Sequence, residues 1–126
     1  MYRNIWLIDD DKDDGELFAE AVQSLNAGIR FRFESNPLQA LELLQRAESL
    51  PEIIFLDLNM PSINGQDLRE KLQDHERFRD IPVVLYSSYS KAAAEQLSLV
   101  NDTDQFISKP GSFEALREIL RLVLNA

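Results

Sequence analysis

The sequence predicts an α/β fold: a doubly wound (βα)5 domain with a parallel five-stranded sheet of order 2-1-3-4-5 and helices on both faces. Three observations predict it. Short apolar runs alternate five times with helical patterns along the 126 residues, which is the order expected of parallel strands joined by crossover helices. The first, third and fourth runs are almost continuously apolar, as strands buried on both faces are. Charged or hydroxyl side chains follow four of the runs, at the edge where such sheets form ligand sites.

The five strands are expected at the apolar runs themselves. They are Ile5–Ile8, Ile29–Glu34, Ile53–Leu56, Pro82–Tyr86 and Asp104–Ile107. The second run contains Phe31-Arg32-Phe33-Glu34, in which apolar and charged residues alternate. Alternation indicates a strand with one solvated face, so we expect this strand at an edge of the sheet.

Helices are expected between the strands and after the last one. Apolar residues recur at helical spacing in two stretches, Leu17, Phe18, Ala21, Val22 and Leu25, and then Phe113, Leu116, Ile119, Leu120, Val123 and Leu124. Asn36-Pro37 is typical of a helix N-cap and first helical residue, and Ser112 of a cap before the last helix. Gly28 follows a helix end.

Composition argues against several classes of protein. The 13 Lys and Arg against 22 Asp and Glu give a formal charge of -9, which disfavours binding to nucleic acid or to an anionic membrane surface. No cysteine is present, so the chain has neither disulfides nor a thiolate metal site. The apolar runs are too short to cross a bilayer, and aspartates interrupt MYRNIWLIDD before a leader could form. We expect one cytoplasmic domain over residues 1–126, without an output domain.

Three aspartates are expected to meet at one edge of the sheet. Asp9 and Asp10 close the first strand, and Asp57 closes the third. If the order is 2-1-3-4-5, these strands are neighbours at the switch point and the three carboxylates converge. Converging carboxylates repel unless a cation neutralises them. A few charged oxygen ligands suit Mg²⁺, which keeps several waters, so the sequence predicts a magnesium site.

The acidic residues after this pair have a simpler interpretation. Asp13 and Asp14 would stabilise a helix N-terminus, and Asp11 is assigned to the cap or to the electrostatic background. A calcium loop is an alternative because Asp9, Asp11, Asp13 and Glu20 occupy positions 1, 3, 5 and 12 of an EF-hand. Its sixth position should be Gly and is Asp14, and a strand precedes it, so this alternative is disfavoured.

Two further strand ends carry matching chemistry. The fourth strand ends in Ser87-Ser88, and the fifth in Ser108-Lys109-Pro110. A hydroxyl and an ammonium at these places could bind an anion held by the metal. Alone, a Ser after a strand is usually part of a turn and a Lys is usually solvated. Lys109 is the more specific signal, because a residue before proline continues the strand direction.

Together these motifs resemble a known family. They are the pair Asp9-Asp10, the segment FLDLNMPSINGQDL around Asp57, PVVLYSS leading to Ser87, and FISKP ending in Lys109-Pro110. At these spacings the chain is similar, over essentially its whole length, to the receiver domain of two-component response regulators, with the CheY-like fold. The resemblance implies a phosphoprotein of two-component signalling rather than an enzyme with a separate substrate.

The resemblance also implies a role for each site residue. Asp57 would be the phospho-acceptor, taking the phosphoryl group from a phosphohistidine on a sensor histidine kinase or a histidine phosphotransfer protein. The implied Mg²⁺ ligands are Asp10, Asp57, the backbone carbonyl of Asn59 and, through water, Asp9. Ser87 and Lys109 would each bind a phosphoryl oxygen, and the chain would afterwards hydrolyse the group from itself.

Two residues are implied to modulate signalling. Phe106 stands where the family often has tyrosine, and it would rotate when Ser87 moves towards the phosphoryl group. Tyr89, two residues after Ser87, is bulky enough to exclude water, while Asn59 offers an amide that could orient water. We expect slow to intermediate hydrolysis.

The output is expected through a downstream protein target or onward phosphotransfer. The charged segment LQDHERFRDIPVVLYSS is similar to regulators that partner bacterial phytochromes, which implies a phytochrome-like kinase. It also implies a homodimer through the face of the fourth helix, fifth strand and fifth helix, including Phe106 and residues 112–126. His75 is interpreted as a loop or helix-end residue.

Three alternatives stay open. An unphosphorylated pseudo-receiver would act only as a protein-binding module, although it normally lacks part of the acidic pair, the acceptor or the lysine. A haloacid-dehalogenase-like phosphatase needs a second acid where this chain has Asn59. A flavodoxin-like electron carrier needs a Ser/Thr-rich phosphate loop after the first strand, where this chain has acid.

Overall fold

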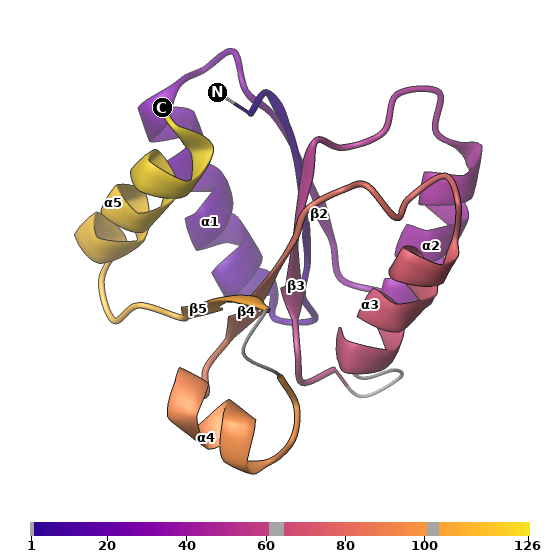
Figure 1. Cartoon of the computed structure of the whole chain (residues 1–126). Helices are drawn as coiled ribbons and strands as arrows, with labels where there is room; N and C mark the ends of the chain where they lie inside the picture. The colour runs from indigo at the N-terminus through magenta and orange to yellow at the C-terminus, as the bar shows by residue number, and fades with distance from the viewer. Residues whose placement is uncertain (1, 61–64, 101–103) are drawn as a thin grey trace.

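The computed structural model describes residues 2–60, 65–100 and 104–126 and shows a five-stranded sheet between helices (Figure 1). The strands are β1 Asn4–Ile8, β2 Arg30–Glu34, β3 Ile53–Asp57, β4 Val83–Ser87 and β5 Gln105–Ser108. The helices are α1 Lys12–Leu25, α2 Pro37–Arg46, α3 Gly65–Asp74, α4 Lys91–Gln96 and α5 Phe113–Leu124. None of the helices in the described part of the chain has the length and apolar character needed to cross a bilayer.

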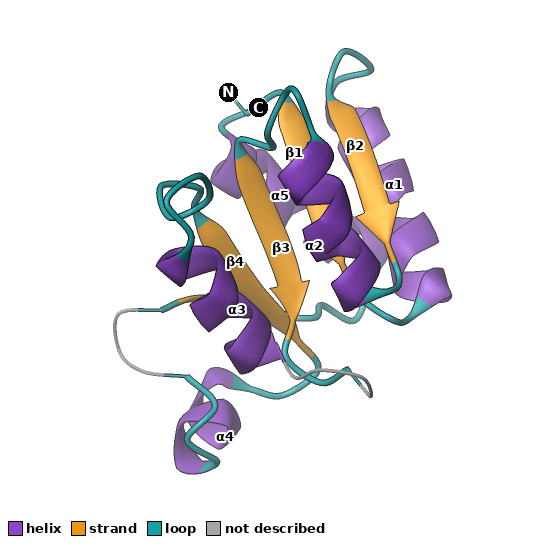
Figure 2. Cartoon of the chain, turned by 90° about the vertical axis from the view of Figure 1, so that its right-hand side faces the viewer, coloured by secondary structure: helices purple, strands orange, loops and turns teal. Residues whose placement is uncertain are grey.

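All strand pairs are parallel, and the sheet order is β2-β1-β3-β4-β5. This confirms the predicted fold and the edge position of the second strand. The register pairs Ile8 with Leu56 and Asp57 with Tyr86, so the strands that carry the aspartates end side by side. Figure 2 shows the strands running to a common edge.

The helices form one layer on each face of the sheet. Helices α2 and α3 cover one face, while α1 and α5 cover the other and pack against each other. In β1, Trp6 and Ile8 contribute to the core under α2 and α3, whereas Ile5 and Leu7 contribute to the core under α1 and α5. Burial on both faces explains why this strand is a continuous apolar run.

The predicted helix caps are confirmed. The Asn36 side chain accepts hydrogen bonds from the backbone N–H groups at the start of α2, and Ser112 does the same at the start of α5. Helix α1 ends at Leu25 with Asn26 as its C-cap, ahead of Gly28.

The strand boundaries differ from the predicted ones by about one residue, as boundaries commonly do. The fourth and fifth strands begin and end one residue later than expected, at Val83–Ser87 and Gln105–Ser108, and β2 begins at Arg30. The shift places Ser87 inside β4 as its last residue. Similarly, Asp57 is the last residue of β3, so strand pairing holds the backbone of both residues.

Candidate functional site

Asp9, Asp10 and Asp57 meet at the common edge of β1 and β3. Each offers a carboxylate oxygen, and these oxygens lie within 4.8 Å of one another. Asp9 is fully buried and Asp57 is 5% exposed, while Asp10 is exposed. The convergence predicted from the strand order is therefore present, with two of the three charges out of solvent.

Short turns after each strand fix the two buried carboxylates. Asp9 Oδ1 accepts a hydrogen bond from the backbone N–H of Asp11 at 3.0 Å. Asp57 Oδ1 accepts one from the N–H of Asn59 at 3.3 Å. Each carboxylate thus bonds the backbone two residues on, which is the local turn typical of aspartate. One oxygen of each side chain is used in this way, and the other is left for the site.

Asp11 caps the helix that follows. Its Oδ1 accepts from the backbone N–H groups of Asp13 at 3.0 Å and Asp14 at 3.1 Å, which confirms the cap assignment. Asp9 directly follows strand β1, not an entering helix, so the EF-hand alternative is wrong.

Lys109 brings a positive charge to the cluster. Its Nζ lies 2.9 Å from Asp9 Oδ2, 2.7 Å from Asp14 Oδ2 and 3.8 Å from Asp57 Oδ2. Its backbone N–H donates to the Ser87 carbonyl at 2.6 Å, which holds the end of β5 against β4. The interpretation of Asp14 as only a helix-start residue is incomplete, because its side chain also binds this ammonium.

One lysine does not neutralise the buried carboxylates. Burial, and next the charge of Asp9, raise the pKa of Asp57 to about 7. Burial likewise raises the pKa of Asp9, and the hydrogen bond from Asp11 and the charge of Lys109 offset this only in part. Burial alone would lower the pKa of Lys109, but its hydrogen bond to Asp14 and the nearby negative charge of Asp9 raise it, so the ammonium stays charged.

The residues fit a small divalent cation. Asp9 Oδ2 is buried and accepts no well-aligned hydrogen bond among the described residues, although the Lys109 ammonium is close. Carboxylate oxygens in small number are the ligands that Mg²⁺ takes. A cation would also offset the burial and the charge of Asp9 that together raise the pKa of Asp57. The cluster therefore has both the ligand atoms and the charge deficit of a metal site.

Ser87 lies on the strand next to Asp57. It is fully buried, and its Oγ accepts a hydrogen bond from the backbone N–H of Tyr89 at 3.1 Å. Ser108 Oγ donates to the Tyr89 carbonyl at 3.0 Å. The β4–α4 turn is thus tied to the ends of both β4 and β5.

Comparison with known proteins identifies the family. Residues 5–121 match the response regulator receiver domain. This chain belongs to that family. Receiver domains are signalling phospho-acceptors that bind Mg²⁺ at an acidic pocket and interact with histidine kinases and downstream targets. The resemblance recognised in the sequence is confirmed.

Two relatives show how the receiver match extends along the chain. The polar-differentiation response regulator DivK of Brucella anthropi is 24% identical over 125 residues, which are 99% of this chain and 98% of DivK. The sensor histidine kinase CheAY of Helicobacter pylori is 24% identical over 114 residues, 90% of this chain but only 14% of that protein.

Solved structures show the same receiver fold. The phosphorylated cyanobacterial phytochrome response regulator RcpA aligns with a TM-score of 0.81 at 22% identity, over 98% of this chain and 91% of that one. The bacteriophytochrome response regulator RtBRR aligns with a TM-score of 0.74 at 26% identity, over 98% and 77% of the two chains.

Tyr89 and Phe106, the two residues predicted to modulate signalling, lie in the β4–α4 turn and in β5. Tyr89 and Phe106 are half-buried and both pack against the core under α2 and α3. Phe106 pairs with Leu85 in the strand register. Asn59 is exposed and donates its N–H to the Asp57 carboxylate. The Phe106 rotation and the metal-ligand role of the Asn59 carbonyl stay predictions.

Two residues near the receiver site were missed in the sequence. Gly65, the first residue of α3, donates its N–H to Leu58 at 3.0 Å, and a Cβ there would overlap the Asp57 carbonyl. The Tyr86 ring centroid lies 5.4 Å from Lys109 Nζ, close enough for a cation–π contact. Gly65 appears in the quoted motif, so its position before a helix was an available signal. The sequence carried no signal for Tyr86, because an aromatic residue in a strand is usually part of the hydrophobic core.

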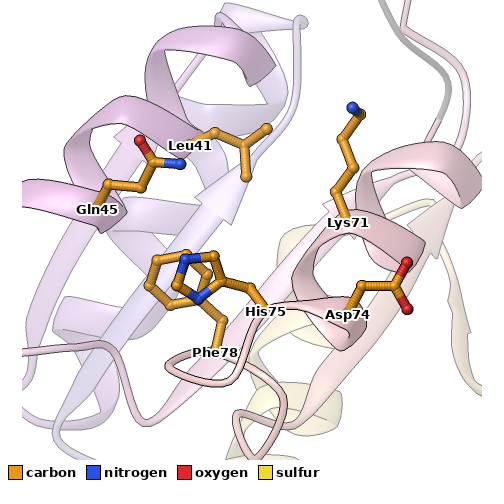
Figure 3. Close-up of a pocket in the computed structure, with 6 residues that line it drawn as sticks. All are labelled: Leu41, Gln45, Lys71, Asp74, His75 and Phe78. Atoms are coloured by element: carbon orange, nitrogen blue, oxygen red, sulfur yellow. The ribbon is translucent and has the colours of Figure 1, made fainter.

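A separate groove lies between α2 and α3, with a volume of about 340 Å³ (Figure 3). Its lining residues are Leu41, Gln45, Lys71, Asp74, His75 and Phe78. None of them belongs to the aspartate cluster. His75 directly follows α3 and stacks on Phe78 with ring centroids 4.3 Å apart, so it is the helix-end residue that the sequence indicated.

Proposed function

We propose that this receiver domain accepts a phosphoryl group on Asp57, in a Mg²⁺-dependent reaction, from a phosphohistidine of a sensor histidine kinase or a histidine phosphotransfer protein. One observation carries the proposal. Asp57 is a buried carboxylate whose oxygens lie within 4.8 Å of those of Asp9 and Asp10 and 3.8 Å from the Lys109 ammonium. A nucleophile, a cation site and a fixed positive charge therefore lie together, as phosphoryl transfer requires.

In this reaction an Asp57 carboxylate oxygen attacks the phosphorus. The new P–O bond forms as the P–N bond to the donor imidazole breaks, and the imidazole keeps the electron pair. Lys109 and Ser87 would each bind an oxygen of the transferred group. Both are held by hydrogen bonds at the ends of β4 and β5, so catalysis is mainly positioning and charge stabilisation.

The metal ligands in this proposal are the carboxylates of Asp10 and Asp57, the backbone carbonyl of Asn59 and, through water, Asp9. Mg²⁺ bound there supplies positive charge that stabilises the negative charge on the transferring group. The cluster meets this role because its own lysine leaves the buried carboxylates short of positive charge.

The chain would act on itself rather than on a separate substrate. It takes one phosphoryl group, changes its contacts with a downstream target or passes the group on, and loses the group by hydrolysis. The likeness to RcpA and RtBRR, whose names describe phytochrome response regulators, supports a phytochrome-like donor kinase. The net charge of -9 supports partners other than nucleic acid or anionic membranes. Cytoplasmic location stays a prediction.

We also propose a homodimer through the α4–β5–α5 face. Two large apolar side chains support it: Leu97, which follows α4 and is 56% exposed, and Leu122 on α5, which is 64% exposed. Leu97 follows a helix that contacts β5, and both side chains are apolar groups that an association surface on this face would bury.

Incubation with acetyl phosphate, followed by intact mass measurement, tests the acceptor chemistry. The parent should gain about 80 Da, the mass of one phosphoryl group, and only when Mg²⁺ is present. Asp57→Asn should gain nothing, and Asp10→Asn should need much more Mg²⁺ because it lacks one ligand. If neither acetyl phosphate nor a phosphorylated histidine donor modifies the parent, the protein is an unphosphorylated binding module instead.

A further inference from the structure

The ammonium of Lys109 is held by a residue outside the acidic pair and the acceptor. Within residues 2–60, 65–100 and 104–126, the hydrogen bond that its Nζ donates goes to Asp14 Oδ2, at 2.7 Å. Asp9 Oδ2 lies nearly as close but accepts no aligned hydrogen bond, and Asp57 Oδ2 is 3.8 Å away. Asp14 is therefore the group that sets the direction of the ammonium.

The direction of the bond to Asp14 decides where the other N–H donors of the Lys109 ammonium point. Lysine has three N–H donors at the end of a flexible stem. With one donor directed at Asp14, rotation about the Cε–Nζ bond is restricted, and the other two N–H groups take set directions. The neighbours on the remaining sides are Asp9 and Asp57, and the Tyr86 ring contacts the charge at 5.4 Å. The lysine is thus oriented before any phosphoryl group arrives.

We propose that Asp14 is a positioning residue, which orients the Lys109 ammonium so that a free N–H donor faces the phosphoryl group on Asp57. The inference rests on the proposed phosphoryl transfer. It goes beyond that reaction because, among the described residues, the Asp14 side chain pairs with the Lys109 ammonium and makes no hydrogen bond or ion pair with Asp57 or the proposed metal ligands. Asp14 lies in the first turn of α1, one turn beyond Asp10, and its side chain reaches Lys109 at the end of β5.

Two effects of Asp14 oppose each other. Its negative charge disfavours the approach of an anionic donor, whereas its hydrogen bond orients the cation that stabilises the transferred group. The Asp14 side chain is 31% exposed and Lys109 is 15% exposed. Solvent therefore screens the long-range repulsion from Asp14, while the direct bond to a charged donor is retained. The orienting effect should dominate.

The test compares Asp14→Ala with Asp13→Ala. Both residues lie in the first turn of α1, and both donate a backbone hydrogen bond to Asp11. Both substitutions remove one negative charge from the same helix end, but only Asp14→Ala removes the bond to Lys109. Asp14→Asn keeps an oxygen acceptor without the charge. Far-UV circular dichroism checks that each variant is folded.

The first readout is the rate of phosphorylation by acetyl phosphate at fixed Mg²⁺. Loss of a hydrogen bond to a charged group should slow Asp14→Ala on the order of tenfold relative to Asp13→Ala, and Asn should recover much of the rate. Equal rates for the Ala variants, or a faster Asp14→Ala, would overturn the inference. If the parent itself is never phosphorylated, the proposed function fails and the catalytic part of this inference fails with it.

The second readout needs no phosphoryl group. The side-chain ammonium of a lysine gives an NMR signal when hydrogen bonding protects it from rapid exchange with water. The Lys109 signal, assigned by its loss in Lys109→Gln, should be present in the parent and in Asp13→Ala and absent in Asp14→Ala. An unchanged signal in Asp14→Ala would show that Asp14 does not hold the lysine.

Discussion

The carboxyl group of Asp57 is buried where its negative charge is unfavourable without a metal. Burial and the charge of Asp9 raise its pKa from 3.8 to about 7. The folded state therefore binds more protons than the unfolded state between these values, and the free energy of unfolding falls as pH rises through the window. Stability is lost towards neutral pH, opposite to the usual behaviour of a salt-bridged aspartate.

Asp57→Asn should therefore stabilise the metal-free protein at pH about 8 and have less effect at pH about 5, since the parent carboxyl is then largely protonated. Urea denaturation at both pH values, with a chelator present, measures the difference. Asp13→Asn is the control, because Asp13 is exposed at the start of α1. Identical pH dependence of the free energy of unfolding in parent and Asp57→Asn would contradict the burial argument.

Tyr89 is expected to protect the phosphoryl group from water. Its side chain packs against the core, while its backbone N–H and carbonyl are bound by Ser87 and Ser108. Tyr89→Ala keeps those backbone bonds but removes the bulk, so the phosphoryl group should be lost several-fold faster. A time course of intact mass after removal of the donor measures the rate, with exposed Ser88→Ala as the control. If Tyr89→Ala loses the phosphoryl group no faster than the parent, Tyr89 does not protect it from water.

The junction between β3 and α3 depends on Gly65. Its backbone approaches Asp57 and Leu58 so closely that a Cβ would overlap the Asp57 carbonyl and lie 2.7 Å from Leu58 Cα. Backbone atoms cannot move aside as a flexible side chain can. Gly65→Ala should cost about 1–3 kcal/mol of stability, as overpacking does, and should slow phosphorylation because the acceptor shifts.

Gly111→Ala is the matched control for this change. Among the described residues beyond its two chain neighbours, no heavy atom lies within 4 Å of the place that a Cβ at Gly111 would take. Its substitution should therefore leave stability and phosphorylation nearly unchanged. Urea denaturation and the acetyl phosphate reaction are compared for both variants. If Gly65→Ala is as stable and as reactive as Gly111→Ala, the close packing of α3 on the acceptor strand is not required.

At this scale the sequence predicts the elements and most of the site. Periodicity and caps predict the strands and helices, and the strand order that the resemblance implies then brings Asp9, Asp10 and Asp57 together. The contacts of Asp14 and Gly65, like that of Tyr86, were missed for physical reasons. Acidic residues in a first helical turn are favoured by the helix dipole anyway, which hides the bond from Asp14 to Lys109. The close approach at Gly65 depends on how α3 packs on β3, which spacing alone does not specify.

The whole molecule presents different apolar side chains on its two helical layers. Leu122 on α5 and Leu38 on α2 are 64% and 52% exposed. If the protein pairs through the α4–β5–α5 face, Leu122→Glu should weaken association by placing a charge in the interface. Leu38→Glu makes the same chemical change on the other layer and should not.

Analytical ultracentrifugation of the phosphorylated parent and of both variants measures this. We expect a concentration-dependent dimer for the parent and for Leu38→Glu, and a monomer for Leu122→Glu over the same range. A dimer that survives Leu122→Glu but is lost in Leu38→Glu would place the interface on the α2 layer instead.

The first and last described segments meet on the side of the sheet away from the aspartates. The backbone N–H of Tyr2 donates to the carbonyl of Leu124 at 3.2 Å, and both ends of the chain lie together at the top of Figure 1. Chain ends so close can be joined by a short linker, and new ends opened elsewhere, without breaking the fold. The domain is thus suited to circular permutation, and a fluorescent protein attached at either end would lie away from the aspartate cluster.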